Sequence, residues 1–203
     1  MIAIIDYGMG NIHSVNKALG LYGVETIVTD KVKDIKSAEK LVLPGVGAFD
    51  DAKEELEKRG LIDLLLEQVR SKKPFLGICL GMQLLFDQSE EAKVSKGLGL
   101  IKGSVKRFEA KEGRKVPHMG WNQLNHLKYD CPLLRDVQND AYVYFCHSYY
   151  PAPSDQNLVA ASTDYGMDFA ALVWKENLFG VQFHPEKSQA VGLKIMENFV
   201  KVC

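Results

Sequence analysis

The chain has 203 residues, a length that fits one domain with a sizeable hydrophobic core. Its composition, 46% hydrophobic and 25% charged, is ordinary for a soluble globular protein. The formal net charge of -1, from 25 basic and 26 acidic side chains, argues against a strongly basic surface that binds nucleic acid.

The sequence predicts neither a membrane segment nor an export signal. No apolar run reaches the roughly 18 residues that a bilayer-spanning helix needs, and the N-terminal run from Met1 to Asp6 lacks the basic start of a signal peptide. Four cysteines stand at wide, irregular spacing without a CxxC pair, so we expect free thiols and no zinc site. A cytosolic protein without a metal or organic cofactor is predicted.

The first half of the chain alternates short apolar runs with segments of helical periodicity. Four strands are expected, at Ile2–Ile5, Glu25–Val28, Lys40–Leu43 and Pro74–Ile78. Helices are expected from the N-cap candidate Asn11 to about Leu21, along one long region that contains Leu56, Leu61, Leu64 and Leu65, and after Cys79. This alternation predicts a parallel sheet that is covered by helices on both faces.

The second half changes character, because short strands and turns dominate from Gly97 to Gln182. Ala170–Trp174 and Leu178–Phe183 flank a short turn and predict a hairpin. A helix from about Ser188 to Val200 closes the chain. We therefore expect one domain over residues 1–203, with an α/β fold in three layers. Its mostly parallel central sheet has helices on both faces and an antiparallel extension from the C-terminal half.

Cys79 stands where an expected strand passes into an expected helix. The run Gly77-Ile78-Cys79-Leu80-Gly81 has the Gly-x-Cys-x-Gly spacing of a nucleophile elbow, in which glycines relieve the crowding of a sharp turn. The dipole at the start of the helix would favour a thiolate, and the Leu80 N–H would donate to a developing oxyanion. Taken alone, the motif fits a buried structural cysteine between two packing glycines equally well.

A thiol nucleophile needs a base, and the base needs an orienting partner. His184-Pro185-Glu186 follows the expected strand Leu178–Phe183, and residues two apart in extended structure face the same side. Glu186 is therefore predicted to hold one imidazole nitrogen of His184 while the other nitrogen meets Cys79. A solvated turn after a strand explains the tripeptide equally well when it is taken alone.

The other cysteines and histidines fit these roles less well. Cys146 lies in an apolar strand and is expected in the core, while Cys131 and Cys203 show no elbow motif. His118 and His147 are expected as core or hydrogen-bonding residues, because neither has a carboxylate two residues on.

Pro44-Gly45-Val46-Gly47 follows the third expected strand. In a parallel sheet this loop would lie at the same carboxyl edge as Cys79. Two glycines let the backbone turn its amides toward the site, which predicts a second oxyanion donor beside Leu80. Without the cysteine motif, an ordinary strand-ending turn would be the preferred interpretation.

Together these residues resemble the triad-type, or class I, glutamine amidotransferases. That family has a Gly-x-Cys-x-Gly elbow with a glutamine four residues after the cysteine, matched by Cys79 and Gln83. It also has a His-Pro-Glu near the end of the domain, matched by His184 and Glu186. The resemblance covers essentially the whole chain. It implies an enzyme that hydrolyses glutamine to glutamate and ammonia through a thioester on Cys79.

Within that family, the sequence looks most like the glutaminase subunits of imidazole glycerol phosphate synthases, which belong to histidine biosynthesis. The shared segments are residues 6–11, 44–47, 117–122 and 184–188. The resemblance implies a heterodimer in which ammonia passes to a (β/α)8-barrel cyclase subunit. That subunit makes imidazole glycerol phosphate and aminoimidazole carboxamide ribonucleotide. Because the chain ends at Cys203, we expect the cyclase to be a separate polypeptide.

The resemblance also implies roles for individual residues. Val46 would supply the second oxyanion amide, after a reorientation of its peptide that the partner drives. The residues that would hold glutamine are Gly47, Gln83, Ser148 and Tyr149. The residues that would face the cyclase are Asn11, Met119, Trp121, Asn122, Tyr144 and Lys187. For Trp121, simple core packing is the competing explanation.

Two other interpretations stay open. One is a glutaminase that feeds another synthase, for anthranilate, guanylate or carbamoyl phosphate, or else a γ-glutamyl or peptide hydrolase. The other is a non-catalytic regulatory or binding module in which Cys79 is structural. The presence of both His184 and Glu186 argues against such a module, and the segment 117–122 favours the histidine-pathway enzyme.

Overall fold

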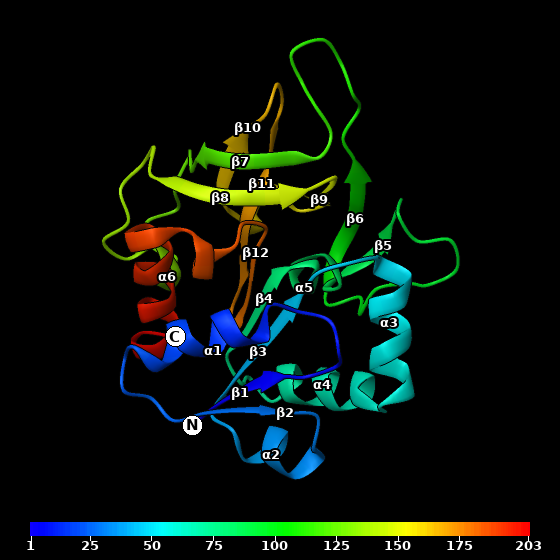
Figure 1. Ribbon diagram of the computed structural model, residues 1–203, viewed down its shortest axis with the longest axis vertical. Coiled ribbons are helices and arrows are strands. Elements are labelled where there is room, and N and C mark those ends of the chain that lie inside the picture. Colours follow the sequence, from blue (N-terminus) through cyan, green and yellow to red (C-terminus); the bar gives the residue numbers. More distant parts are fainter.

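The computed structural model describes all 203 residues, and its largest sheet has seven strands in the order β10-β11-β12-β4-β3-β1-β2 (Figure 1). These strands are Ile2–Ile5 (β1), Thr26–Thr29 (β2), Lys40–Gly45 (β3), Phe75–Cys79 (β4), Val159–Asp164 (β10), Asp168–Lys175 (β11) and Leu178–Val181 (β12). The five strands from β2 to β12 are parallel, and β11 and β10 continue the sheet in antiparallel pairing. The predicted sheet with its antiparallel extension is confirmed.

Helices cover both faces of this sheet, with α1 and α6 on one face and α3 and α4 on the other (Figure 1). The helices are Ile12–Gly20 (α1), Val32–Ser37 (α2), Phe49–Lys58 (α3), Leu61–Arg70 (α4), Leu80–Gln83 (α5) and Gln189–Lys201 (α6). Within β1, Ile2 and Ile4 join the core cluster of α1 and α6, whereas Ala3 and Ile5 join that of α3 and α4. This alternation is what a strand buried on both faces requires.

Two smaller sheets stand beyond the carboxyl edge of the large one (Figure 1). One combines β5 (Phe86–Ser89), β6 (Ile101–Arg107) and β9 (Tyr149–Pro153), and the other pairs β7 (His118–Gln123) with β8 (Tyr142–His147). Short 3-10 turns occur at Pro132–Leu134 (η1), Gln156–Leu158 (η2) and Pro185–Lys187 (η3).

None of the helices has the length and apolarity that crossing a membrane would require.

Three details of the expected helices were wrong. The long helical region is two helices, because Gly60 adopts a left-handed φ of 65° between α3 and α4. The helix after Cys79 has only four residues, and Phe86 begins a strand instead. Leu84, Leu85 and Phe86 are all fully buried, and a short apolar run that is buried all round does not distinguish helix from strand by periodicity. The short helix α2 was not expected.

Asn11 stands at the N-cap position of α1, but its side chain makes no capping hydrogen bond. Its backbone carbonyl accepts the N–H of Val15, and its amide Nδ2 instead donates to Glu186 Oε1 at 3.3 Å. The predicted N-cap position is therefore confirmed, but the side chain does not cap the helix, because its amide binds a carboxylate 175 residues away in the sequence.

The strand register brings the expected site to one edge of the sheet. Gly45 lies beside Cys79 in the β3–β4 pairing, and Val181 lies beside Ile78 in the β12–β4 pairing. Because these strands are parallel, the chain segments that follow each of them leave the sheet at the same carboxyl edge. Segments 46–47, 79–83 and 182–186 therefore meet there.

Candidate active site

Cys79 occupies the sharp turn between β4 and α5 with φ 55° and ψ -110°. A positive φ is unusual for a residue with a Cβ atom and stores backbone strain. The flanking glycines make the turn sterically possible. A Cβ on Gly77 would lie 2.6 Å from the carbonyl oxygen of Gly81, and one on Gly81 would lie 1.9 Å from that of Leu43. The turn thus presents the thiol at the sheet edge while its neighbours pack without side chains.

The helix that follows is shorter than the motif predicts. α5 has a single turn, so its dipole contributes little to a thiolate at Cys79. The expected dipole support is therefore small, and charge stabilisation has to come from a neighbouring side chain.

His184 is that neighbour, and it is held on several sides. Its imidazole shares the wall of one cavity with Cys79, and its Nδ1 lies 2.9 Å from Glu186 Oε1. Both side chains are buried, with exposed fractions of 4% and 0%. The backbone N–H of His184 donates to the Tyr144 carbonyl, and its own carbonyl accepts the Ser188 hydroxyl at 2.6 Å. Glu186 reaches the imidazole from the 3-10 turn η3 rather than from the extended segment that was expected.

The charge state of His184 follows from these contacts. Burial by itself lowers the pKa of His184, but hydrogen bonds and negative charge from Cys79 and Glu186 outweigh burial and raise that pKa to about 10. Beside a Cys79 thiolate, the imidazole therefore keeps its proton at neutral pH. The arrangement places a thiol beside an imidazole that a carboxylate orients, which is the geometry that cysteine-based acyl transfer requires.

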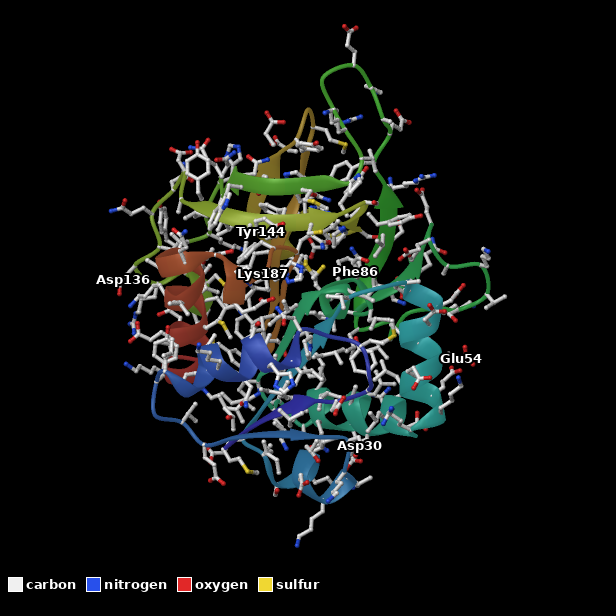
Figure 2. All side chains as sticks on the ribbon, viewed as in Figure 1. Asp30, Glu54, Phe86, Asp136, Tyr144 and Lys187 are labelled. Atoms are coloured by element: carbon white, nitrogen blue, oxygen red, sulfur yellow. The ribbon has the colours of Figure 1, made fainter.

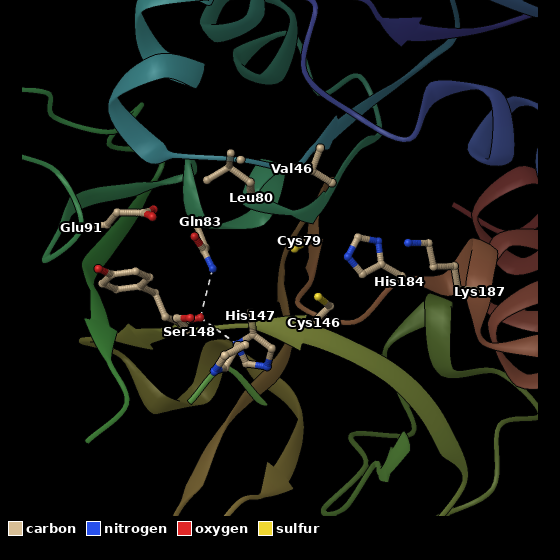
Figure 3. Close-up of a pocket in the computed structure, with 13 residues that line it drawn as sticks. Val46, Cys79, Leu80, Gln83, Glu91, Cys146, His147, Ser148, His184 and Lys187 are labelled. Atoms are coloured by element: carbon tan, nitrogen blue, oxygen red, sulfur yellow. Dashed lines mark hydrogen bonds between the residues drawn. The ribbon is translucent and has the colours of Figure 1, made fainter. Parts of the chain in front are cut away.

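A cavity of about 320 Å³ opens beside the sulfur of Cys79 (Figure 3). Every residue that was expected to form the oxyanion hole or to hold glutamine lines it, namely Val46, Gly47, Leu80, Gln83, Ser148 and Tyr149. Gln83 Nε2 donates to the Tyr149 carbonyl and to Gln182 Oε1, both at 3.0 Å. The cavity thus combines a thiol, an imidazole and several polar groups.

Three residues around this cavity were not assigned a role from the sequence. Gln182 is fully buried and its amide Nε2 lies 3.7 Å from the Cys79 sulfur. Glu91 brings a carboxylate to the cavity wall from the loop after β5. Cys146 was expected in the core but is half-buried and lines the cavity, because β8 turns this residue toward the site. Only Gln182 had a sequence signal, since it stands two residues before His184.

The residues expected to face a partner divide into two groups. Met119 and Trp121 of β7 are exposed by 62% and 46%, so core packing does not explain Trp121. Lys187 Nζ lies 6.0 Å from the ring centroid of Tyr144, and the two side chains are adjacent in Figure 2. Asn11 and Asn122, by contrast, use their amides for hydrogen bonds inside the chain.

No cluster of three His, Cys, Asp or Glu side chains has the arrangement of a metal site.

The family model for "Glutamine amidotransferase class-I" matches residues 3–203. The chain belongs to the class I glutamine amidotransferases. The expectation of a glutamine-hydrolysing enzyme, rather than a protein of another class, is confirmed by this membership.

This amidotransferase is similar along its length to curated relatives. It is 51% identical to "Imidazole glycerol phosphate synthase subunit HisH" of Geobacter sulfurreducens, over 98% of this chain and 97% of the relative. It is 52% identical to the subunit of the same name from Desulfitobacterium hafniense, over 99% and 94%. The histidine-pathway branch that residues 117–122 favoured is thereby confirmed.

Solved structures share the fold of this amidotransferase at low sequence identity. One described as "glutamine amidotransferase" superposes with a TM-score of 0.75 at 17% identity, over 99% of this chain and 98% of that one. A putative GMP synthase subunit from Thermoplasma acidophilum gives 0.73 at 19%, over 100% and 92%. These likenesses confirm the expected fold class.

Proposed function

We propose that this amidotransferase is the glutaminase subunit of an imidazole glycerol phosphate synthase, with Cys79 as its nucleophile. The observation that carries the chemistry is the contact series from Cys79 through His184 to Glu186 at the wall of a cavity. Identity at about half of all positions with HisH subunits supports this enzyme over an anthranilate, guanylate or carbamoyl phosphate synthase.

The reaction is a two-stage acyl transfer. The Cys79 thiolate attacks the side-chain amide carbon of glutamine, and N–H groups at Leu80 and Val46 stabilise the oxyanion. Each such donor contributes about 3 kcal/mol to the transition state. His184 protonates the leaving nitrogen, which departs as ammonia and leaves a γ-glutamyl thioester. Water that His184 deprotonates then hydrolyses the thioester to glutamate.

The cavity wall supplies complementary groups for glutamine. The carbonyl and amide groups around Gln83, Ser148 and Tyr149 suit its polar ends, and Gly47 leaves room beside the nucleophile. Glu91 suits the α-ammonium group. Burial raises the pKa of Glu91, the Phe49 N–H opposes that rise, and the charges of Asp50 and Asp51 add to it. A bound ammonium would offset the cost of that half-buried carboxylate.

Ammonia leaves toward a separate cyclase subunit, which we take to be a (β/α)8 barrel in a cytoplasmic heterodimer. The exposed apolar side chains of Met119 and Trp121, and the adjacent Tyr144 and Lys187, suit a docking surface for that subunit. The curated relatives are named as subunits, and this chain spans 97% of one of them.

The loop Gly45-Val46-Gly47 is the proposed switch between idle and working states. Without the partner, the Val46 amide does not point toward the oxyanion. The isolated chain should therefore hydrolyse glutamine about 10²–10³-fold more slowly, which is the effect of losing one oxyanion donor. Glutamate release by the isolated chain and by the complex with its nucleotide substrate measures this difference. Full turnover by the isolated chain would remove the switch from the account.

Replacing Cys79 by alanine tests the function itself. The C79A variant should lose glutamine hydrolysis because no thioester can form, yet it should bind the cyclase and support synthesis with added ammonia. Cys146→Ala is the matched control, since it removes a thiol from the same cavity and should retain activity. Glutaminase activity that survives in C79A would refute the nucleophile assignment.

A further inference from the structure

Two buried histidines stand beside the cavity without a part in the acyl-transfer steps. His118 of β7 and His147 of β8 lie opposite each other in the antiparallel pairing, and their exposed fractions are 3% and 6%. His118 Nδ1 lies 3.0 Å from His147 Nε2. The His118 ring is stacked on Phe145 and Tyr165, with centroid separations of 4.8 and 4.0 Å. Both imidazoles are therefore fixed in place.

The groups at the two ends of this pair determine where its protons are. Asn122 Nδ2 lies 3.3 Å from His118 Nε2, and because an amide nitrogen only donates, His118 must accept there and carry its proton on Nδ1. That Nδ1–H donates to His147 Nε2. At the other end, His147 Nδ1 lies 2.8 Å from the Tyr149 carbonyl, which only accepts. Both ends thus require the same tautomer, with each histidine neutral and protonated on Nδ1.

Burial keeps the pair neutral. It lowers the pKa of His118 to about 4. For His147, burial lowers the pKa to about 3, with the Tyr149 carbonyl opposing and the charges of His118 and His184 adding to the shift. Neither imidazole takes up a second proton near neutral pH, so the direction of their hydrogen bonds is maintained.

The same hydrogen-bond chain continues to the nucleophile. The Tyr149 carbonyl that accepts from His147 also accepts from Gln83 Nε2 at 3.0 Å, and Figure 3 draws both bonds. Gln83 Nε2 donates in addition to Gln182 Oε1. The Nε2 of Gln182 is directed at the Cys79 sulfur at 3.7 Å. A continuous series of contacts therefore joins β7 to the reacting atom.

We propose that His118 and His147 are positioning residues for glutamine hydrolysis. In this relay, the chain of hydrogen bonds from Asn122 through both imidazoles, every donor is directed toward the Tyr149 carbonyl. The relay fixes that carbonyl and, through it, the amides of Gln83 and Gln182 beside Cys79. The proposal rests on the function proposed above. Without the relay, the Tyr149 carbonyl keeps only Gln83 as a donor and the buried His147 loses its partner, so the glutamine-binding wall of the cavity is free to shift.

The tautomers are open to direct measurement on the unmodified chain. Long-range proton–nitrogen NMR spectra of the ¹⁵N-labelled protein distinguish the two neutral imidazole forms and the imidazolium. At neutral pH we expect His118 and His147 both to be neutral and protonated on Nδ1. An Nε2-protonated or doubly protonated form of either residue would overturn the relay, whether or not the chain hydrolyses glutamine.

Two substitutions at His118 test the positioning role in the complex with the cyclase. His118→Phe keeps a ring between Phe145 and Tyr165 but removes both nitrogens. It should lower kcat/KM for glutamine about tenfold, chiefly through KM, as expected for a lost buried hydrogen bond. His118→Asn places an amide donor near the position of Nδ1 and should restore most of that loss.

Controls separate this role from packing and from the proposed function. Both variants should bind the cyclase with parental affinity, which shows that folding and docking are intact. His126→Asn makes the same change at an exposed histidine with a φ of 51° and should leave glutamine turnover unchanged. Parental kcat/KM in His118→Phe, or an equal loss in His118→Asn, would overturn the proposal. An inactive parent enzyme would instead refute the proposed function, and the NMR result would still decide the relay.

Discussion

The buried histidines of this chain have pKa values that are shifted in opposite directions, although burial lowers the pKa of all three. The hydrogen-bonded His184 has its pKa raised, whereas His118 and His147 have theirs lowered. The difference lies in their partners, because His184 meets a carboxylate and a thiol, while the other two meet only neutral groups. One kind of side chain thus favours the protonated form in one place and the neutral form in another part of the same site.

The buried histidine pair should make the protein sensitive to acid. Its pKa values are lower in the folded chain than in the unfolded one, so the unfolded chain binds more protons below about pH 6.5. The free energy of unfolding should therefore fall as pH drops from 7 toward 4. His118→Phe should reduce that slope by about one proton. Urea unfolding at several pH values measures both slopes, and equal slopes would contradict the assignment.

His184 acts in a different pH range. Because its pKa is raised in the folded chain to about 10, its contribution to stability is complete below about pH 6.5 and is lost as the pH rises through 10. The contribution of His184 therefore falls on the alkaline side and does not interfere with the acidic limb of the pair.

At the level of single residues, the sequence predicted what short spacing encodes. Cys79 carries an elbow motif, and His184 and Glu186 stand two apart, so both were open to prediction. Glu91 and Cys146 have no such spacing to the nucleophile, and only the packing of β5 and β8 brings them to the cavity. The tautomers of His118 and His147 likewise depend on contacts with Asn122 and Tyr149 that no local pattern indicates.

At the level of elements, the junction of β3, β4 and α5 depends on backbones that touch. A Cβ on Gly81 would lie 1.9 Å from the Leu43 carbonyl oxygen, so Gly81→Ala should force the elbow away from β3. We expect a loss of about 3 kcal/mol in the free energy of unfolding, together with loss of glutaminase activity. Chemical denaturation measures the first effect.

Gly20 offers a matched control for this substitution. It ends α1 with nothing within 4 Å of the position that a Cβ would take, so Gly20→Ala should be neutral or stabilise the protein by about 0.5–1 kcal/mol. Equal stabilities for the two alanine variants would mean that the close approach of α5 to β3 is not real.

The elements that were predicted well are those with a strong period or a clear boundary. The strands β1, β3 and β4 and the closing helix α6 fall within one or two residues of expectation. The errors at residues 59–60 and 84–86 arose where a single glycine divides one amphipathic pattern, and where burial on all sides removes the pattern. Tertiary packing decided those segments.

At the level of the whole molecule, the cavity draws on chain segments from residue 46 to residue 187. The small sheet of β7 and β8 contributes one wall of the cavity and also carries the exposed side chains Met119 and Trp121. The same two strands carry His118 and His147, whose hydrogen bonds reach the Tyr149 carbonyl at the cavity. A partner that docks on this sheet would therefore contact the strands that carry the histidine pair.

Trp121→Ala tests that docking surface. An exposed tryptophan at the centre of an interface commonly contributes about 2 kcal/mol or more, so the variant should bind the cyclase at least about 30-fold more weakly. Val94→Ala removes a side chain that is 87% exposed in the loop after β5 and serves as the control. Calorimetric titration with the cyclase measures both affinities. Equal affinities would place the docking surface elsewhere.

The most direct measurement of the central assignment is the site at which a glutamine-like electrophile attaches. The complex is treated with the reagent, and the peptides that contain the four cysteines of this chain are mapped by mass spectrometry. We predict modification of Cys79 alone, although Cys146 opens to the same cavity, because Cys79 stands on the sharp turn between β4 and α5 and its charge raises the pKa of His184. Labelling of Cys146, or similar labelling of all four cysteines, would contradict the account.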